Sequence, residues 1–96
     1  MNKYEIMFIV KATQDSSEIT KTADAMKAII TDNKSKVAEF KELGEKKLAY
    51  PIKKEISGYY YVMQVEATHD AISEFNRKAL LDERVIRHLV IKLDEE

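Results

Sequence analysis

The fold is decided by residues 36–67, KVAEFKELGEKKLAYPIKKEISGYYYVMQVEA, which lie between two segments of helical periodicity. Residues 36–52 are typical of one long extended segment interrupted at Gly44, and residues 59–67 of a second strand. Residues 53–58 between them have the composition of a turn, so the whole stretch predicts a β-hairpin. Because ordinary strands have about five or six residues, we expect the first strand to bulge or project beyond the sheet near Gly44.

Upstream of this hairpin, the pattern predicts a strand followed by a helix. Residues 4–10 alternate with period two, which favours a strand with one fully buried face. Asp15 followed by Glu18 resembles a capping box and marks the expected start of the helix, which should end at residues 31–33. Apolar side chains recur every three or four positions in this helix. They are Ile19, Ala23, Met26 and Ile30.

Downstream, the order is again helix and then strand. Thr68 is a suitable N-cap, and residues 85–93 predict the last strand. The apolar face of the second helix is expected to comprise Ile72, Phe75, Ala79 and Leu80. The complete order predicts an α+β ferredoxin-like βαββαβ sandwich, with both helices on one face of a four-stranded antiparallel sheet. We expect this single domain over residues 1–93 and a short acidic tail at 94–96.

Composition restricts the function. The chain has 96 residues, 45% of them hydrophobic, which is enough for one domain with one core. The absence of Cys excludes disulfides, thiolate zinc sites and Cys nucleophiles, and fits a cytoplasmic protein. His69 and His88 have no metal-binding spacing, and Gly44 and Gly58 form no phosphate-binding loop. We therefore expect no enzymatic activity, cofactor, metal, small-molecule substrate or membrane segment.

Charge is distributed unevenly along the chain. The net charge is −1, yet residues 41–54 and residues 77–92 each carry five basic against two acidic side chains. Two basic segments in a nearly neutral protein favour a localised surface that binds a polyanion, provided that the fold brings them together. Ordinary surface lysines are the alternative interpretation.

The tyrosines of residues 57–63, SGYYYVM, only partly match the motif in which aromatic side chains of a third strand stack on RNA bases. Alternation along the strand places Tyr59 and Tyr61 toward the helices, which predicts that they belong to the core. The opposite face keeps an apolar set, which indicates either a protein partner or ordinary half-buried sheet residues. This set comprises Met7, Ile9, Tyr60 and Val62.

Residues 43–53, LGEKKLAYPIK, strongly resemble the central motif of the family of the bacterial small-subunit ribosomal protein numbered six. The resemblance continues through KYE at residues 3–5, GYY at 58–60 and RVIRHLVIK at 84–92, and covers essentially the whole chain. Many members of that family have Arg where this chain has Lys46 and Lys47, and Lys lacks the planar fork that binds phosphate through two hydrogen bonds.

The resemblance implies a structural constituent of the small ribosomal subunit, located on the cytoplasmic ribosome. It implies binding to 16S ribosomal RNA at the platform, as a heterodimer with the small-subunit protein numbered eighteen. The expected RNA contacts are Lys3, Lys46, Lys47, Lys53, Arg84, Arg87, His88 and Lys92. The expected contacts with the protein partner are Met7, Ile9, Tyr50, Tyr60 and Val62.

The sheet order of the family places the first and last strands side by side. This order implies that Lys3, Arg87 and Lys92 form one basic edge. The alternative to the ribosomal reading is a ferredoxin-like metabolite-sensing or oligomerisation module without RNA binding, because the fold alone does not decide the function.

Overall fold

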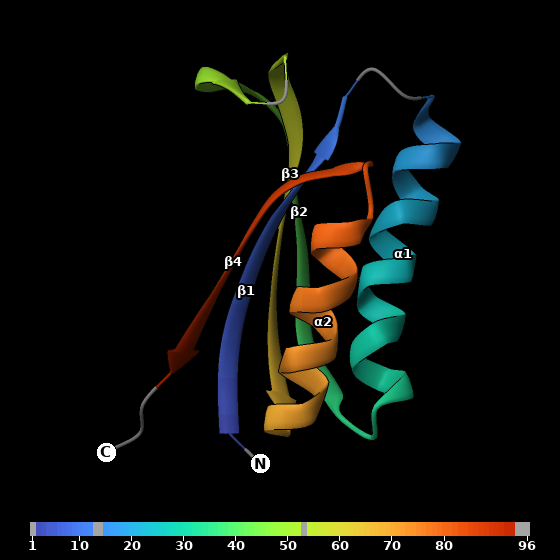
Figure 1. Cartoon of the computed structure of the whole chain (residues 1–96), viewed down its shortest axis with the longest axis vertical. Coiled ribbons are helices and arrows are strands. Elements are labelled where there is room, and N and C mark those ends of the chain that lie inside the picture. The colour runs from blue at the N-terminus through green and yellow to red at the C-terminus, as the bar shows by residue number, and fades with distance from the viewer. Residues whose placement is uncertain (1, 13–14, 53, 94–96) are drawn as a thin grey trace.

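The two helices cover one face of a single antiparallel sheet (Figure 1). The computed structural model describes residues 2–12, 15–52 and 54–93. Its elements are β1 (Asn2–Lys11), α1 (Ser16–Asp32), β2 (Lys36–Ile52), β3 (Glu55–Ala67), α2 (His69–Leu81) and β4 (Val85–Leu93). The strand order is β2-β3-β1-β4, so the predicted α+β ferredoxin-like fold is confirmed. The predicted acidic tail at 94–96 lies outside the described residues.

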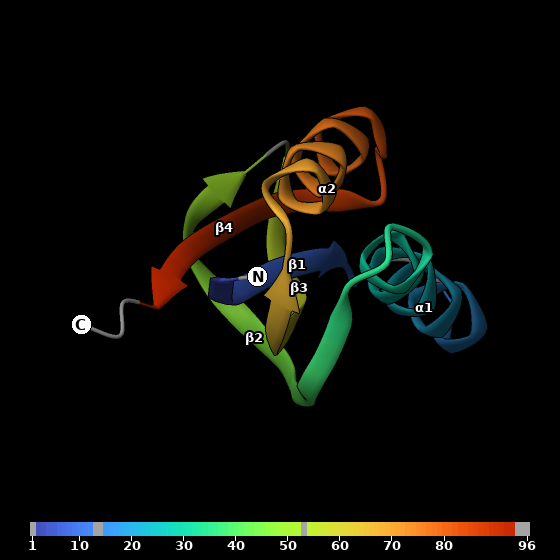
Figure 2. The same ribbon diagram turned by 90° about the horizontal axis from the view of Figure 1, so that it is seen from below.

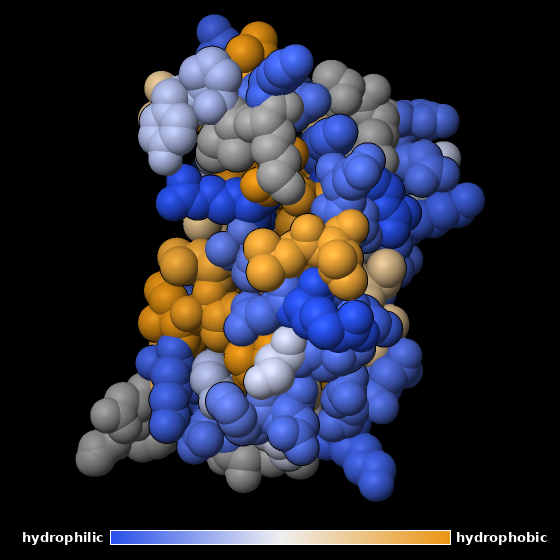
Figure 3. Space-filling model, viewed as in Figure 1, coloured by the Kyte–Doolittle hydropathy of each residue, from blue (hydrophilic) through white to orange (hydrophobic). Residues whose placement is uncertain are grey.

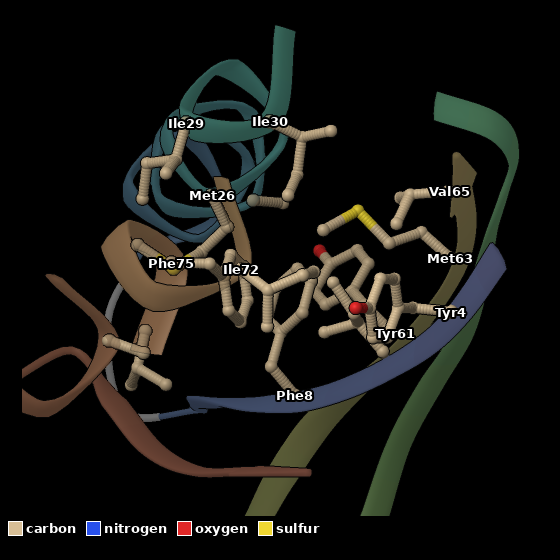
Figure 4. Close-up of a cluster of buried hydrophobic side chains, with 14 of the residues drawn as sticks. Tyr4, Phe8, Met26, Ile29, Ile30, Tyr61, Met63, Val65, Ile72 and Phe75 are labelled. Carbon is tan, nitrogen blue, oxygen red and sulfur yellow. The ribbon is translucent and has the colours of Figure 1, made fainter. Parts of the chain in front are cut away.

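The core lies between the helices and the sheet. Figure 4 shows the rings of Phe8, Tyr61 and Phe75 meeting there. The Phe8 and Tyr61 ring centroids are 5.2 Å apart in a stacked arrangement, and Phe75 lies 6.3 Å from Phe8. Burial raises the pKa of the Tyr61 hydroxyl. Tyr61 is therefore a core residue, as alternation predicts, and Tyr59 packs against the same core.

The helix α1 buries its predicted apolar face and ends where the sequence predicts, with Asn33 as C-cap. Its N-terminus differs from the prediction. Asp15 occupies the N-cap position, but its side chain makes no capping hydrogen bond. The predicted capping box is wrong because the Glu18 carboxylate lies beside Arg84 instead, with 3.9 Å between Glu18 Oε1 and Arg84 Nη1.

The helix α2 begins as predicted, since the Thr68 hydroxyl accepts a hydrogen bond from the Ala71 backbone N–H. Leu80 does not belong to the apolar face, because its side chain is 73% exposed. Successive residues of an α-helix point about 100° apart. Ala79 points into the core, so Leu80 is turned toward solvent, while Ala71 joins the buried face.

The hairpin of β2 and β3 extends past the end of β1, as the interruption at Gly44 predicts. The register of β2 against β3 shifts between Glu42 and Gly44, and Gly44 has a φ of +89°, a conformation that favours glycine. Beyond this bulge, residues 44–52 and 54–57 form the part that we call the hairpin arm. Figure 1 shows the arm at the top of the molecule, beyond the end of β1.

The strand β3 starts four residues earlier than predicted, at Glu55 instead of residue 59. The expected turn at residues 53–58 is therefore too long. Ser57 and Gly58 pair with Lys47 and Lys46 of β2, so these residues extend the ladder instead of forming a loop.

Candidate functional site

The sheet face that carries no helix is called the open face here, and β1 contributes Met7 and Ile9 to it. Residues directly opposite each other in antiparallel strands share a face. Met7 lies opposite Val62, and Ile9 lies opposite Tyr60. The register thus brings four of the residues predicted from the sequence as partner contacts into one group.

The hairpin arm returns over the open face and meets β4. Figure 2, seen from below, shows β2 curving around the sheet toward β4. Arg87 Nη1 donates a hydrogen bond of 3.0 Å to Oη of Tyr50, so the two strands touch through side chains. This contact closes one end of a pocket of about 160 Å³, which we call the open-face pocket. It is lined by Met7, Ile9, Leu48, Ala49, Tyr50, Tyr60, Arg87 and Leu89.

Lys46 and Lys47 lie on the arm, and both are exposed. Lys46 pairs with Gly58, and its Nζ lies 5.9 Å from the centroid of the Tyr60 ring, within the range of a cation–π contact. Successive strand residues point to opposite faces, so Lys47 lies on the other side of the arm. Lys46 and Lys47 therefore place a cation on each of the two faces of the arm.

Arg84 is engaged within the chain. Its Nε and Nη2 donate to the two carboxylate oxygens of Asp82 at 2.9 Å and 2.8 Å. These hydrogen bonds hold the pKa of Asp82 below its ordinary range and raise the pKa of Arg84. The proximity of Glu18 balances the charge further. The structure thus argues against the sequence-based assignment of Arg84 as an RNA contact.

His88 and Lys92 lie on the helix side of β4. His88 pairs with Phe8 of the buried face, and its ring meets the edge of Phe75 with 6.0 Å between centroids. Lys92 pairs with Tyr4, which is also buried. Neither residue shares a face with Arg87, which pairs with Ile9.

The basic edge expected from Lys3, Arg87 and Lys92 does not form. Lys3 is on the open face opposite Leu93, six positions along β1 from the residue that pairs with Arg87. At about 3.3 Å per residue, this separation is about 20 Å. Lys92 lies on the opposite face, and Lys53 lies outside the described residues.

The residues predicted to contact the protein partner differ in how exposed their side chains are. Ile9 is only 3% exposed, so it belongs to the floor of the open-face pocket, and its assignment as a surface contact is wrong. Tyr50 is 58% exposed, whereas Met7, Tyr60 and Val62 are half-buried.

Sequence reasoning missed Leu89 and Ile91, which are each 47% exposed. They lie opposite Met7 and Glu5 and extend the apolar area of the open face. Figure 3 shows hydrophobic side chains gathered on the β4 side of the molecule. The alternation of residues 85–93 could have predicted this, because side chains two positions apart in a strand lie on the same face. Leu89 and Ile91 therefore share the face of Arg87.

The described residues offer basic and apolar surfaces for binding. Within residues 2–12, 15–52 and 54–93, no cluster of His, Cys, Asp or Glu could hold a metal ion. No helix in that same part of the chain is both long enough and apolar enough to cross a membrane. The fold and the site therefore define a small α+β domain with basic and apolar contact surfaces.

The chain matches the family model described as Ribosomal protein S6 over residues 3–92, and it belongs to that family. It is 40% identical over 92 residues to the small ribosomal subunit protein bS6 of Phytoplasma australiense, covering 96% of this chain and 99% of the relative. It is 41% identical over 92 residues to the protein of the same name from Phytoplasma mali strain AT, covering 96% and 98%.

The solved structures agree with the sequence relatives. The crystal structure of 30S ribosomal protein S6 from Thermotoga maritima superposes with a TM-score of 0.91 at 26% identity, covering 96% of this chain and 87% of that chain. As a member of this family, the chain is a structural protein of the small subunit of the cytoplasmic ribosome, and it is not an enzyme.

Proposed function

We propose that the chain binds 16S ribosomal RNA at the platform of the small subunit, together with the small-subunit protein numbered eighteen. The observation that carries this proposal is the hairpin arm. Its tip projects past the end of β1. The arm carries the exposed Lys46 and Lys47 on its two faces and is joined by a side-chain hydrogen bond to Arg87.

Folded RNA presents dense phosphate, and each Lys or Arg that contacts it releases condensed counterions. A projecting arm with a cation on each face can enter a groove and contact both of its walls. Glu45, an acidic neighbour of these lysines, accepts a hydrogen bond of 3.1 Å from Ser57 Oγ on the same arm. Because Lys side chains on the arm would contact phosphates, we expect the chain to recognise the backbone and shape of the RNA, with few contacts to base edges.

The other residues predicted from the sequence as RNA contacts are expected to contribute to RNA binding to different degrees. Lys3 stays a candidate for a second, separate RNA contact at the far end of the open face. Lys53 lies outside the described residues and stays a candidate because its sequence position falls between the two parts of the arm. His88 and Lys92 lie on the helix side, and we expect them to contribute less than the arm.

The partner protein is expected on the apolar part of the open face. Met7 and Val62 lie there beside Leu89 and Ile91, and the last two side chains are about half exposed. An exposed apolar area of this kind on a small protein usually marks a protein contact. It lies next to the arm, so one surface would serve RNA and protein together.

The test is a filter-binding titration of the purified chain against a platform-junction RNA fragment, with and without protein eighteen, at several salt concentrations. The double variant Lys46→Ala/Lys47→Ala should weaken binding by roughly tenfold and lower the slope of log K against log salt by about two. The matched control is Lys21→Ala/Lys78→Ala, which removes the same charge from the helices. Absence of salt-sensitive binding by the wild-type chain with its partner would refute the proposal.

A further inference from the structure

The hairpin arm carries an acidic side chain directly before Lys46 and Lys47. This residue is Glu45, which is exposed as the two lysines are. The register of β2 against β3 places Glu45 opposite Tyr59 and Lys47 opposite Ser57. Tyr59 packs against the core, so Glu45 and Lys47 share the face of the arm on the helix side. A carboxylate and an ammonium group therefore lie side by side on one face, and Lys46 lies on the other.

A hydrogen bond holds the Glu45 carboxylate in place. Ser57 Oγ donates to Glu45 Oε2 at 3.1 Å, from β3 across to β2. Because Ser57 lies directly opposite Lys47, this hydrogen bond keeps the carboxylate near the position of Lys47. Within the described residues, the structure has no ion pair that joins Glu45 to Lys46 or Lys47. The Lys47 ammonium group is therefore open to an external anion, with a fixed negative charge beside it.

The fixed carboxylate is near enough to act on a phosphate that approaches Lys47. Side chains two positions apart on one face of a strand lie about 6.6 Å apart. This separation is shorter than the Debye length of about 8 Å at physiological ionic strength, so salt screens the carboxylate only in part. A phosphate that approaches between the two groups meets repulsion from Glu45. Lys47 with Glu45 beside it therefore accepts phosphate from fewer directions than a lone lysine does.

We propose that Glu45, held by Ser57, is a specificity-determining residue of the hairpin arm, because its charge weakens the binding of unrelated RNA more than that of the platform RNA. This inference rests on the proposed function and names the group that discriminates between RNAs. Contacts with phosphate supply essentially all of the non-specific binding to nucleic acids. A repulsive group selects against the partners that meet it and costs little for a partner whose shape avoids it.

The two classes of RNA differ in how they are oriented on the arm. The platform RNA meets the arm in the orientation that its shape and protein eighteen impose, so its phosphates lie at fixed positions relative to Glu45. An unrelated RNA duplex binds through its phosphates alone and samples many orientations. The orientations that bring a phosphate next to the carboxylate are repelled. Glu45 therefore raises the ratio of specific to non-specific affinity.

The first experiment measures filter-binding affinities of the complete chain bound to protein eighteen, for the platform-junction RNA and for an unrelated RNA duplex of the same length. Glu45→Gln removes the charge and keeps an oxygen that can accept from Ser57. Affinity for the unrelated duplex should rise roughly threefold at about 50 mM salt, and less at about 200 mM, because salt screens the repulsion. Affinity for the platform RNA should change by less than about 1.5-fold. The matched control is Glu42→Gln, which removes the same charge from β2 before the Gly44 bulge and should leave both affinities unchanged.

The second experiment tests which lysine the carboxylate opposes. Lys47→Ala should lower the affinity for the unrelated duplex about twofold more in the Glu45→Gln background than in wild type, because the Lys47 charge is no longer opposed there. Lys46→Ala should lower it equally in both backgrounds, since Lys46 lies on the other face of the arm. Ser57→Ala keeps the charge and frees the carboxylate. The ratio of platform affinity to duplex affinity should therefore fall toward that of Glu45→Gln.

Three results would overturn this inference and leave the proposed function standing. In the first, Glu45→Gln and Glu42→Gln change the ratio of the two affinities equally. In the second, Glu45→Gln lowers the affinity for the platform RNA, which would make Glu45 a contact or a support of the arm. In the third, the losses for Lys46→Ala and Lys47→Ala depend equally on Glu45. A wild-type ratio in Ser57→Ala would refute the role given to Ser57. Absence of salt-sensitive binding of the platform RNA by the wild-type complex would instead refute both proposals.

Discussion

Arg87 of β4 donates a hydrogen bond of 3.0 Å to Tyr50 of β2, although these strands form opposite edges of the sheet. The two residues are 37 positions apart in sequence. The contact spans the open face and ties the hairpin arm to the far side of the sheet. The contact therefore adds a second restraint on the arm, beside the strand ladder that pairs Lys46 with Gly58 and Lys47 with Ser57.

Loss of this hydrogen bond should loosen the arm and leave the core unchanged. In Tyr50→Phe, we expect faster amide hydrogen exchange over residues 44–50, because the arm can then open locally. The free energy of unfolding should change by less than about 1 kcal/mol, since the group is exposed. Tyr60→Phe is the control, because it removes a hydroxyl from the same pocket and keeps the Arg87–Tyr50 contact. Identical exchange in all three proteins would show that the contact does not hold the arm.

The ion pair of Asp82 and Arg84 should give the protein a pH-dependent stability at acid pH. The pKa of Asp82 is lower in the folded state than its ordinary value of about 4. The stabilisation is thus complete above the ordinary value and is lost as the pH falls through the folded value. Asp82→Asn should cost about 1 kcal/mol at pH 7, a low value because Arg84 is partly exposed.

The measurement is urea denaturation of both proteins between pH 7 and pH 2. The difference in unfolding free energy should be constant above about pH 5 and should shrink below about pH 4. Glu83→Gln, which removes the neighbouring exposed carboxylate, should show a smaller change. If the difference in unfolding free energy between wild type and Asp82→Asn stays the same down to pH 2, the ionised Asp82 carboxylate is not the source of the stabilisation.

The two glycines should respond differently to a methyl group. A Cβ at Gly58 would collide with Cγ2 of the buried Ile9 and lie 3.2 Å from the Val10 carbonyl oxygen. Gly58→Ala should therefore cost about 1–3 kcal/mol of unfolding free energy through overpacking. A Cβ at Gly44 meets nothing within 4 Å, so Gly44→Ala costs only the strain of its φ of +89°, about 1 kcal/mol.

Urea unfolding measures the loss for each glycine variant, and a double-mutant cycle tests the collision at Gly58. Shortening Ile9 to Val in the Gly58→Ala background gives its Cβ no more room, because Cγ2 remains. Ile9→Ala removes Cγ2 and should recover part of the loss caused by Gly58→Ala in a double-mutant cycle. Additive losses would show that the two side chains do not collide.

The apolar area of β4 should carry the affinity for the protein partner. Leu89→Ser should weaken the complex with protein eighteen by roughly tenfold, because an exposed contact side chain is lost. Leu80→Ser removes the same atoms from an exposed position on α2, on the other side of the sheet, and should have no effect. Isothermal titration calorimetry gives both affinities. Equal losses for the two variants would refute the open-face assignment.

The element order and the core could be predicted because each depends on local periodicity. The alternation that buries Phe8 and Tyr61 is visible in the sequence, and the structure confirms it. The site was less accessible to prediction. Whether Arg84 faces RNA or Asp82 depends on the turn between α2 and β4, which brings their side chains within 2.9 Å.

The open-face pocket also lay beyond sequence reasoning. The contact of Tyr50 with Arg87 requires β2 to curve across the open face. The sequence predicts the irregularity near Gly44, but it does not predict the register shifts between Val37 and Glu39 and between Lys47 and Ile52. The sequence also assigned Leu80 wrongly to the buried face of α2. A single step of about 100° around the helix decides whether a side chain faces the core or solvent.

The hairpin arm extends past β1, away from the cluster of buried side chains that supports the fold. Substitution of its exposed side chains, such as Lys46 and Lys47, would leave heat resistance and cellular abundance nearly unchanged. A screen that measures protein abundance would therefore classify such variants as neutral. Their effect would be seen only as slow or faulty assembly of the small subunit.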